Sequence, residues 1–564
     1  MQFELLNKSS NDYYNIQQTI FNNRGITDIK KFKKCDESLL NDYDLLCNIN
    51  EAYDTYLYHI KQNNNICIIV DCDVDGYVSA SMIYKHIKSI NQELSVRYLL
   101  HSAKEHGLND LIENIPDETN LVIVPDAGSN DVSSCRILKE KGIDVIVLDH
   151  HNIDIENPYA IIVNCQDGKY PNPDLCGAGV VFKFLQKYDD EFWTNYAENN
   201  IDIVALALIA DMVNVISNEN RYLIKQGIHN VKSTFFDTLI KKTYQFPSDY
   251  SVTDIQMKIV PVINGCIRAG SIEDKDVLFK AFADIDKDKT LIRTYRGKKY
   301  KENIYEKALR LAINAKNRQD SLVKKAIPFI TSQIELENGI AICDLTDIPL
   351  KESKHYTGLI ANKVANKYHK PCIVFNYNDT EDIYRGSGRN CNSSPIENFS
   401  KILSETGAFH LIQGHDNAFG ISFKNKDKMT DVVNNIQLPN EYINKVDFII
   451  PYELFDVKML IDMVDANEYI GRGFPDIKVA ITNVQVDAFE IMGKCDNNWK
   501  IISDEGIAYV NFDTCEDKLI ELYNDNWEIP NSTRINIVGK PQINHYGGIV
   551  TPQIVVEDYE IVGC

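Results

Sequence analysis

The sequence has no apolar run that approaches the roughly 20 residues needed to cross a bilayer. Its first residues, MQFELLNKSS, lack the basic stretch and the apolar core of a secretory signal peptide. None of its 14 cysteines belongs to a Cys-x-x-Cys pair, which argues against a zinc module and against a disulfide framework. We therefore expect a cytoplasmic protein with no membrane segment, in which most cysteines are small buried side chains.

Positive charge is also scarce, because 59 Lys and Arg stand against 81 Asp and Glu and give a formal net charge of −22. This balance opposes nucleic-acid binding, for which a basic surface is expected. The segment from Lys287 to Lys325 is an exception, with 13 basic and 4 acidic residues. It is consistent either with a solvated helical face or with one wall of a channel for a phosphate backbone. Acidic residues that bind metal ions would also contribute to the negative total.

The 564 residues are enough for three or four domains of ordinary size. Alternating strands and helices predict an α/β fold with a doubly wound, mostly parallel sheet, and a second α/β region follows with a glycine-rich turn at 385–389. Short alternating strands near the C-terminus favour an OB-like β-barrel of about five strands, with a hairpin at His545-Tyr-Gly-Gly. The predicted segments are 1–60 (helical), 61–235 (catalytic α/β domain), 236–330 (helical connector), 331–440 (second α/β domain) and 445–564 (β-barrel).

Acidic and imidazole side chains follow three of the predicted strands. Three aspartates come directly after ICIIV, one ends LVIV, and an Asp-His-His tripeptide ends DVIVL. In an open parallel sheet, ligands bind outside the carboxyl ends of the strands, so these groups should meet at one edge. A further aspartate ends the apolar run IDIVALALIA, where a buried carboxylate needs a partner. The residues concerned are Asp71, Asp73, Asp75, Asp126, Asp149, His150, His151 and Asp211.

Oxygen and imidazole ligands without thiolate suit Mn²⁺ or Mg²⁺. Their number exceeds what one ion takes from a protein, and two ions about 3.5–4 Å apart, bridged by one carboxylate, would use them all. Two simpler interpretations compete. Asp-x-Asp-x-Asp-Gly also opens an EF-hand loop, but Met82 stands where that loop needs Glu, and a strand precedes it. A single aspartate at a strand end could merely cap the helix that follows it. Capping is a poor explanation for acidic residues at all three strand ends.

The ordered set of motifs resembles the DHH phosphoesterases and, within them, the RecJ exonucleases. IIVDCDVDG, PDAG, LDHH and ALIADMV are similar to the four aspartate and histidine motifs of the family. Outside them, FNNRGITD, NCQDGKYPNPDLCGAGVVFK and PVINGCIRAG look like further RecJ segments, and RGSGR and QGHDNAFG look like motifs of the DHHA1 domain. The resemblance covers nearly the whole chain, and it implies a DHH domain, a connector, a DHHA1 domain and an OB-fold.

The resemblance also implies roles for individual residues. The implied ligands of two Mn²⁺ or Mg²⁺ ions are Asp73, Asp75, Asp126, His150 and Asp211, with Asp126 bridging and Asp71 a further ligand or a support. His151 would contact the scissile phosphate. The implied phosphate-binding residues at the 5′ end are Arg268, Gly386, Ser387, Gly388 and Arg389, with His415 near the same cleft. We expect the glycines to expose backbone N–H groups to the phosphate.

The chain departs from the RecJ pattern at one place of functional interest. In HSAKEHGLN an arginine of the family motif is missing, and His106 replaces a tyrosine. The resemblance implies 5′→3′ degradation of single-stranded DNA to 5′-mononucleotides by a monomer, with a single-strand-binding protein or a helicase as candidate partners. The alternatives are a DHH hydrolase of oligoribonucleotides or other small nucleotides, and an inactive RecJ-like replication scaffold.

Overall fold

The computed structural model describes the chain except residues 9–10, 103–104, 244–249, 332–338, 350–355, 392–393, 439–441, 487–488, 494–496, 513–516, 527–528, 531, 547–548 and 564. The chain forms two compact units. One unit comprises Ile26–Lys316 and Ala466–Asp476, and the other comprises Met1–Gly25, Asn317–Asp465 and Ile477–Cys564. Among the described residues, no helix combines the length and the apolar character that a membrane crossing requires.

The first unit is built on a parallel sheet of five strands in the order β3-β2-β4-β5-β6. The strands are β2 (Ile66–Val70), β3 (Val96–Leu100), β4 (Leu121–Pro125), β5 (Asp144–Asp149) and β6 (Ile161–Asn164). All residues of β2 and β4 are buried, as a sheet covered on both faces requires. The chain runs from β2 outward to β3 and returns to β4 on the other side of β2, so the order reverses between β2 and β4.

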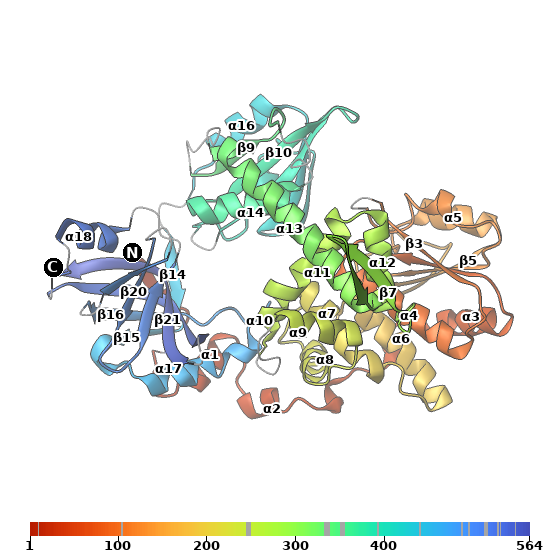
Figure 1. Cartoon of the computed structure of the whole chain (residues 1–564), viewed down its shortest axis with the longest axis horizontal. Coiled ribbons are helices and arrows are strands. Elements are labelled where there is room, and N and C mark those ends of the chain that lie inside the picture. The colour runs from red at the N-terminus through yellow and green to blue at the C-terminus, as the bar shows by residue number, and fades with distance from the viewer. Residues whose placement is uncertain are drawn as a thin grey trace. The chain divides into compact units, whose positions relative to one another are not determined.

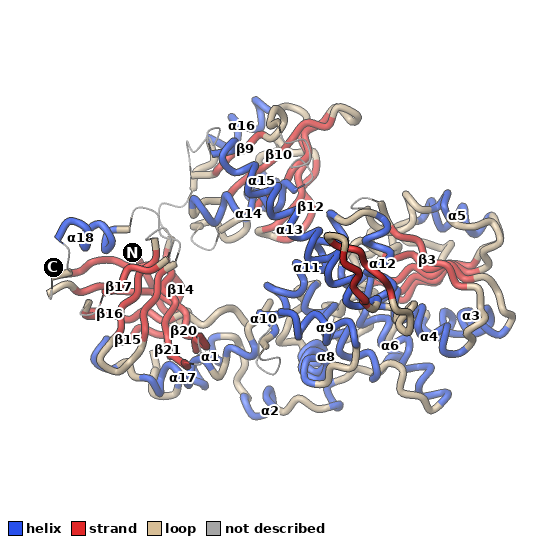
Figure 2. The backbone as a smooth tube through the Cα atoms, viewed as in Figure 1, coloured by secondary structure: helices blue, strands red, loops and turns tan. Residues whose placement is uncertain are grey.

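Helices cover both faces of this sheet (Figures 1 and 2). Alternate residues of β2 belong to different cores: Ile68 packs with α3, α4, α6 and α7, whereas Ile69 packs with α5. These helices are α3 (Ile49–Lys61), α4 (Val74–Ile90), α5 (Val132–Glu140), α6 (Gly177–Phe192) and α7 (Ile201–Ala210). The predicted doubly wound α/β architecture is confirmed.

The rest of this unit is mainly helical. Its helices are α2 (Ile29–Lys33), α8 (Asn218–His229), α9 (Thr234–Thr243), α10 (Val252–Asp254), α11 (Val260–Ala269) and α12 (Ile272–Phe282), and α13 (Ile304–Thr331) continues into the second unit. The prediction of a helical connector at 236–330 is wrong for one part of the basic segment. Residues 291–302 form an antiparallel hairpin of β7 (Leu291–Tyr295) and β8 (Lys298–Glu302). β-branched and aromatic residues on both sides of a Gly turn favour strands there.

The second unit contains an α/β region with the sheet order β12-β13-β11-β10-β9. Its strands are β9 (Ala341–Asp344), β10 (Cys372–Asn378), β11 (Ile383–Arg389), β12 (Leu411–His415) and β13 (Ala418–Phe423). Its helices are α14 (Thr357–Tyr368), α15 (Phe399–Glu405) and α16 (Lys426–Asn434). The predicted glycine-rich turn at 385–389 is wrong, because these residues lie in β11, which pairs with β10 on one side and β13 on the other.

The C-terminal region forms one seven-stranded sheet in the order β15-β16-β20-β21-β19-β18-β17. Its strands are β15 (Phe448–Pro451), β16 (Val479–Gln485), β17 (Phe489–Met492), β18 (Asn498–Ile502), β19 (Ala508–Asn511), β20 (Arg534–Tyr546) and β21 (Ile549–Gly563), and its helices are α17 (Val457–Val464) and α18 (Lys518–Asn526). It has more strands than the predicted five. β20 and β21 are antiparallel, and the glycines of the expected hairpin lie outside the described residues.

The N-terminus belongs to this C-terminal region and is not wholly helical as predicted. β1 (Gln2–Leu5) pairs in parallel with β14 (Ile443–Val446). After α1 (Ile16–Asn23), the guanidinium of Arg24 forms a buried ion pair with Asp447, with Nη1 at 2.8 Å from Oδ1. Such pairing between residues far apart in sequence leaves no periodic signal in the first residues.

Candidate metal centre

Asp126 occupies the centre of the predicted cluster. It follows β4 with a φ of 68°, in the left-handed region that side chains other than glycine seldom adopt. This conformation turns the chain sharply at the sheet edge. Gly177, at the start of α6, permits the resulting contact, because a Cβ at that position would lie 2.5 Å from Asp126 Oδ1. The close approach places the carboxylate against the helix start and explains why this position has no side chain.

Asp126 belongs to two groups of ligand atoms, in each of which all atoms lie within 4.8 Å of one another. The first group joins it to Asp71 and Asp73, and the second joins it to His150 and His151. A third group of the same compactness contains Asp75, His150 and Asp211. Asp126 and His150 are therefore shared between neighbouring groups. The structure thus brings together every residue predicted as a metal ligand, from four separate stretches of chain.

The electrostatics of the cluster favour a bound cation. Burial, followed by the charges of Asp75 and Asp73, holds the pKa of Asp126 well above its usual range. Among the described residues, its Oδ1 is buried with no hydrogen-bond donor, although His150 Nε2 lies 3.2 Å away. Burial also raises the pKa of Asp211 to about 7, with the charge of His150 opposing the shift. Carboxylates this close cannot all ionise without compensating charge, so the donor set fits divalent cations with oxygen and nitrogen ligands.

Asp75 is held by the backbone of the neighbouring helix. Its two carboxylate oxygens accept hydrogen bonds from the N–H groups of Gly177 and Ala178, at 2.7 and 2.8 Å. These N–H groups begin α6, where the helix dipole favours negative charge. The imidazole of His150 lies between Asp75 and Asp211, with nitrogen–oxygen distances of 3.9 and 3.8 Å. The GAG sequence at 177–179 therefore positions one carboxylate and allows the close packing of another.

Asp149 faces His151 and positions it. Its carboxylate accepts from the N–H groups of His150, His151 and Ser129, and from the Nδ1 of His151 at 2.8 Å. Burial alone would lower the pKa of His151, but the hydrogen bond and charge of Asp149 raise it to about 9. The imidazole is thus cationic at neutral pH, and its side chain is 54% exposed. Such a group can stabilise negative charge on a phosphate.

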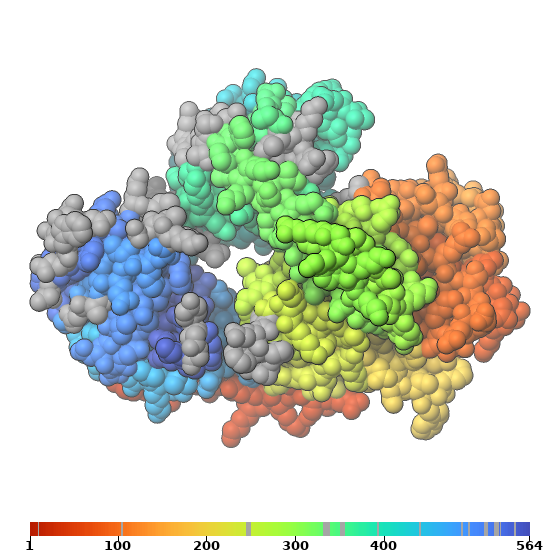
Figure 3. Space-filling model, in the orientation of Figure 1, coloured from red at the N-terminus to blue at the C-terminus, as the bar shows by residue number. Residues whose placement is uncertain are grey.

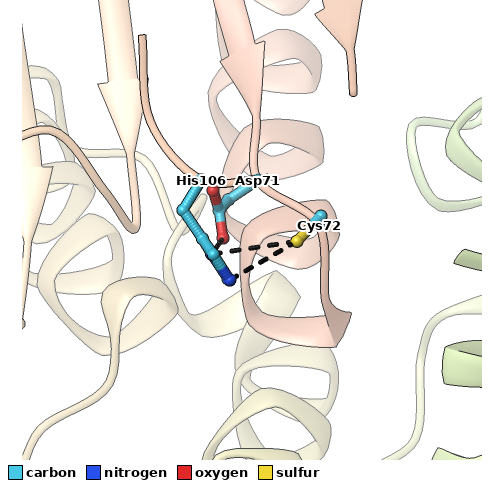
Figure 4. A group of neighbouring side chains, drawn as sticks. All are labelled: Asp71, Cys72 and His106. Carbon is cyan, nitrogen blue, oxygen red and sulfur yellow. Dashed lines mark hydrogen bonds and ion pairs between the residues drawn. The ribbon is translucent and has the colours of Figure 1, made fainter. Parts of the chain in front are cut away.

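Asp71 has partners that the sequence did not reveal. Figure 4 shows the ring of His106 facing both the carboxylate of Asp71 and the sulfur of Cys72. His106 Nδ1 lies 2.6 Å from Asp71 Oδ2, and the N–H of Gly107 donates to Oδ1 at 3.1 Å. The hydrogen bond with Asp71 raises the pKa of His106 to about 11. Buried His101 lies 3.9 Å from the same carboxylate. With both oxygens in use, Asp71 is better placed to support the cluster and its adjoining loop than to bind an ion alone.

Ser387 and Arg389 point to the same side of β11, where α14 begins. Ser387 Oγ lies 2.9 Å from the hydroxyl of Thr357, and a Cβ at Gly358 would lie 2.7 Å from Arg389 Nη2. A helix N-terminus beside a guanidinium and two hydroxyls is suited to binding a phosphate. Thr357 and Gly358 therefore join Ser387 and Arg389 as candidate phosphate-binding residues of this unit. They were not predicted from the sequence, although their place at the start of a predicted helix could have indicated them.

Gly386 and Gly388 do not form the backbone cradle that was expected. Both lie in a strand with partners on each side, so the sheet takes up their backbone groups. Their lack of a side chain serves packing instead: a Cβ at Gly388 would lie 2.3 Å from the ring of Phe419, and one at Gly386 would lie 2.2 Å from the Val374 carbonyl oxygen. Any phosphate contact in this motif must come from side chains.

The two remaining predicted residues are exposed. Arg268 lies in the last turn of α11, and His415 ends β12. Their assignment to substrate binding remains a prediction.

Comparison with known protein families gives two matches. Residues 65–210 match the DHH family, N-terminal domain, and residues 446–558 match the RecJ OB domain. The first range contains every residue of the aspartate and histidine cluster except Asp211, which follows it directly. The second range contains most of the seven-stranded sheet.

Comparison with individual proteins extends over the full length. A Bacillus subtilis prophage protein, YorK, provisionally named a single-strand DNA-specific exonuclease, is 34% identical over 586 residues, which cover 100% of this chain and 98% of the relative. The single-stranded-DNA-specific exonuclease RecJ of the same species is 24% identical over 90% of this chain and 63% of its own length. The crystal structure of Thermus thermophilus RecJ in complex with Mn²⁺ matches 99% of this chain and 78% of that chain, with 15% identity and a TM-score of 0.73.

Proposed function

Since the chain belongs to the RecJ-like single-strand DNA-specific exonucleases of the DHH phosphoesterase superfamily, we propose that it hydrolyses single-stranded DNA from the 5′ end and releases 5′-mononucleotides. The main support for this proposal is that Asp126 and His150 lie close to carboxylates from separate stretches of the chain. Relatives named as exonucleases and a neighbour solved with Mn²⁺ support it.

The residues of the cluster would divide the work between them. Asp73, Asp75, Asp126, His150 and Asp211 would hold two Mn²⁺ or Mg²⁺ ions, which supply water activation and charge neutralisation when bound. His151, kept cationic by Asp149, would donate a hydrogen bond to a phosphate oxygen and stabilise charge that develops there. The raised pKa of Asp126 and Asp211 means that ion binding would release protons from these groups.

The 5′→3′ direction of degradation would be set by binding of the terminal 5′-phosphate beside α14. Arg389 would pair with it, and Ser387 and Thr357 would donate hydroxyl hydrogen bonds. To test this, Arg389→Gln is compared with wild type on 5′-phosphorylated and 5′-hydroxyl single strands. Arg385→Gln is the matched control, because Arg385 is on the same strand, exposed and paired with Glu381. We expect Arg389→Gln to lose the preference for the 5′-phosphate and Arg385→Gln to keep it; equal losses on both substrates would contradict this role.

The function itself is tested with end-labelled substrates. The protein is incubated with 5′- and 3′-labelled single-stranded and duplex DNA and RNA, with Mn²⁺ or Mg²⁺, and the products are separated by length. Immediate release of the 5′ label as a mononucleotide from single-stranded DNA is the expected result. Turnover of short oligonucleotides only would favour a small-substrate hydrolase, and no metal-dependent turnover would favour a scaffold.

A further inference from the structure

The β7–β8 hairpin carries a concentration of positive charge that the metal centre does not explain. Its strands and turn, residues 291–302, hold five cationic side chains and one carboxylate, Glu302, in a chain whose net charge is −22. The cations are Arg293, Arg296, Lys298, Lys299 and Lys301. In the contacts of the described residues, none of these five forms an ion pair, whereas nearby Lys289 is paired with Asp286. The charge is therefore available to a partner.

The base of the hairpin is fixed to the unit, and its tip is exposed. Glu302 accepts two hydrogen bonds from the guanidinium of Arg310 in α13, at 2.7 and 3.1 Å, and Leu291 packs against the main core. The tip turns at Arg296 and Gly297, which both have positive φ, at 48° and 76°. This is the backbone of a two-residue type I′ turn. A basic residue therefore occupies a turn position that usually favours Asn, Asp or Gly.

Aromatic rings alternate with the cations on one face. Register places Arg293 opposite Tyr300 and Tyr295 opposite Lys298, so these four side chains share a face. The Arg293 guanidinium lies over both rings, 5.0 Å from the centroid of Tyr295 and 5.4 Å from that of Tyr300. The two tyrosines are still 50% and 45% exposed. This contact keeps aromatic surface and positive charge side by side in solvent. Figures 1 and 3 show the green hairpin at the front of the view.

We propose that the β7–β8 hairpin binds single-stranded DNA, with its cations on the phosphates and Tyr295 and Tyr300 stacking on bases. Charge complementarity identifies a polyanion. The exposed rings favour a single strand over a duplex, because only unpaired bases are free to stack on a side chain. This inference rests on the proposed function, since it gives the substrate strand a second contact outside the metal centre.

Binding without hydrolysis tests the hairpin separately from the catalytic site. Fluorescein-labelled (dT)30 and a 30-base-pair duplex are titrated with the full-length protein in EDTA, and fluorescence anisotropy is measured. One variant replaces Lys298, Lys299 and Lys301 by Gln, and another replaces Tyr295 and Tyr300 by Ala. The matched control, Lys61→Gln, Lys141→Gln and Lys242→Gln, removes the same charge from exposed positions of the same unit. Circular dichroism and the melting temperature check that each variant folds.

We expect each hairpin variant to weaken (dT)30 binding by about tenfold and the control to change it less than about twofold. Wild-type affinity in both hairpin variants, or losses on the duplex alone, would overturn the proposal. Metal-dependent hydrolysis of the dinucleotide pTpT distinguishes the two hypotheses. Hairpin variants should cleave pTpT as wild type does. If wild type cleaves neither pTpT nor (dT)30, the proposed function fails, while the binding comparison still decides the role of the hairpin.

Discussion

The buried aspartate cluster and the exposed β7–β8 hairpin differ in the sign of their charge and in their exposure to solvent. The cluster collects negative charge where burial raises carboxylate pKa values, so each group depends on the exact position of its neighbours. The hairpin collects positive charge in solvent, where screening weakens the coupling between side chains, so their contributions to binding a polyanion largely add. Single substitutions should therefore have large effects in the cluster and small ones in the hairpin.

The largest effect is expected from Asp126→Asn. It removes the carboxylate shared by two ligand groups, and kcat on single-stranded DNA with Mn²⁺ should fall by at least about 10³-fold, since a charge-stabilising contact is lost. Binding of (dT)30 in EDTA should be retained. Asp117→Asn, on the exposed surface of the same domain, is the control and should leave both quantities unchanged. Near-normal turnover in Asp126→Asn would show that the cluster is not the catalytic centre.

Gly177→Ala should have the next largest effect. The new Cβ would lie 2.5 Å from Asp126 Oδ1, so either the carboxylate or the start of α6 must move. Displacing a ligand in this way should reduce turnover by about 10- to 100-fold and raise the Mn²⁺ concentration needed for half-maximal rate. Gly420→Ala is the control, because its Cβ would lie no closer than 3.7 Å to any described atom outside the two neighbouring residues. An unchanged metal requirement in Gly177→Ala would argue against this packing.

His106→Asn should reduce turnover by about tenfold, because it removes the imidazole that holds Asp71 at 2.6 Å without removing any predicted ligand. Steady-state rates and the Mn²⁺ dependence are measured together. His229→Asn, in the last turn of α8, serves as the control. A loss as large as that of Asp126→Asn would mean that His106 acts on the substrate or the ions directly.

A smaller effect is predicted for stability and its pH dependence. The folded-state pKa of Asp211, about 7, is above its ordinary value. Without metal, its contribution to the free energy of unfolding is therefore present at low pH and is lost as pH rises through 7. Metal reverses this, because it binds the ionised groups. The rise in melting temperature on adding Mn²⁺ should therefore be greater at pH 8 than at pH 6, and should correspond to about 2.7 kcal/mol at 100 times the Kd. Equal shifts at both pH values would contradict this coupling.

The smallest effect is expected from one hairpin charge. Lys299→Gln should lower the slope of log Kd against log salt for (dT)30 by about 0.7, the value for one phosphate contact on a single strand. Affinity at fixed salt should change only severalfold. Lys141→Gln, exposed in the same unit, should leave the slope unaltered. A slope unchanged in Lys299→Gln as well would mean that the strand does not pass this part of the hairpin.

The sequence by itself determined the aspartate cluster and the parallel sheet that positions it. Apolar runs ending in acidic residues specify buried parallel strands, and such strands present their carboxyl ends at one edge. For this reason Asp71, Asp126 and Asp149 could be placed together before their contacts were known. The local pattern and one topological rule were sufficient to predict the cluster, because most of the predicted ligands come directly after strands.

Only the tertiary structure decided features that depend on pairing between distant residues. RGSGR is a central strand because β10 and β13 pair with it, and Gly388 is needed there for the Phe419 ring. β1 exists through its pairing with β14, more than 400 residues away in the sequence. The bond between His106 and Asp71 likewise depends on a loop returning to the sheet edge. No local periodicity encodes such contacts, since their free energy comes from partners that meet only in the folded chain.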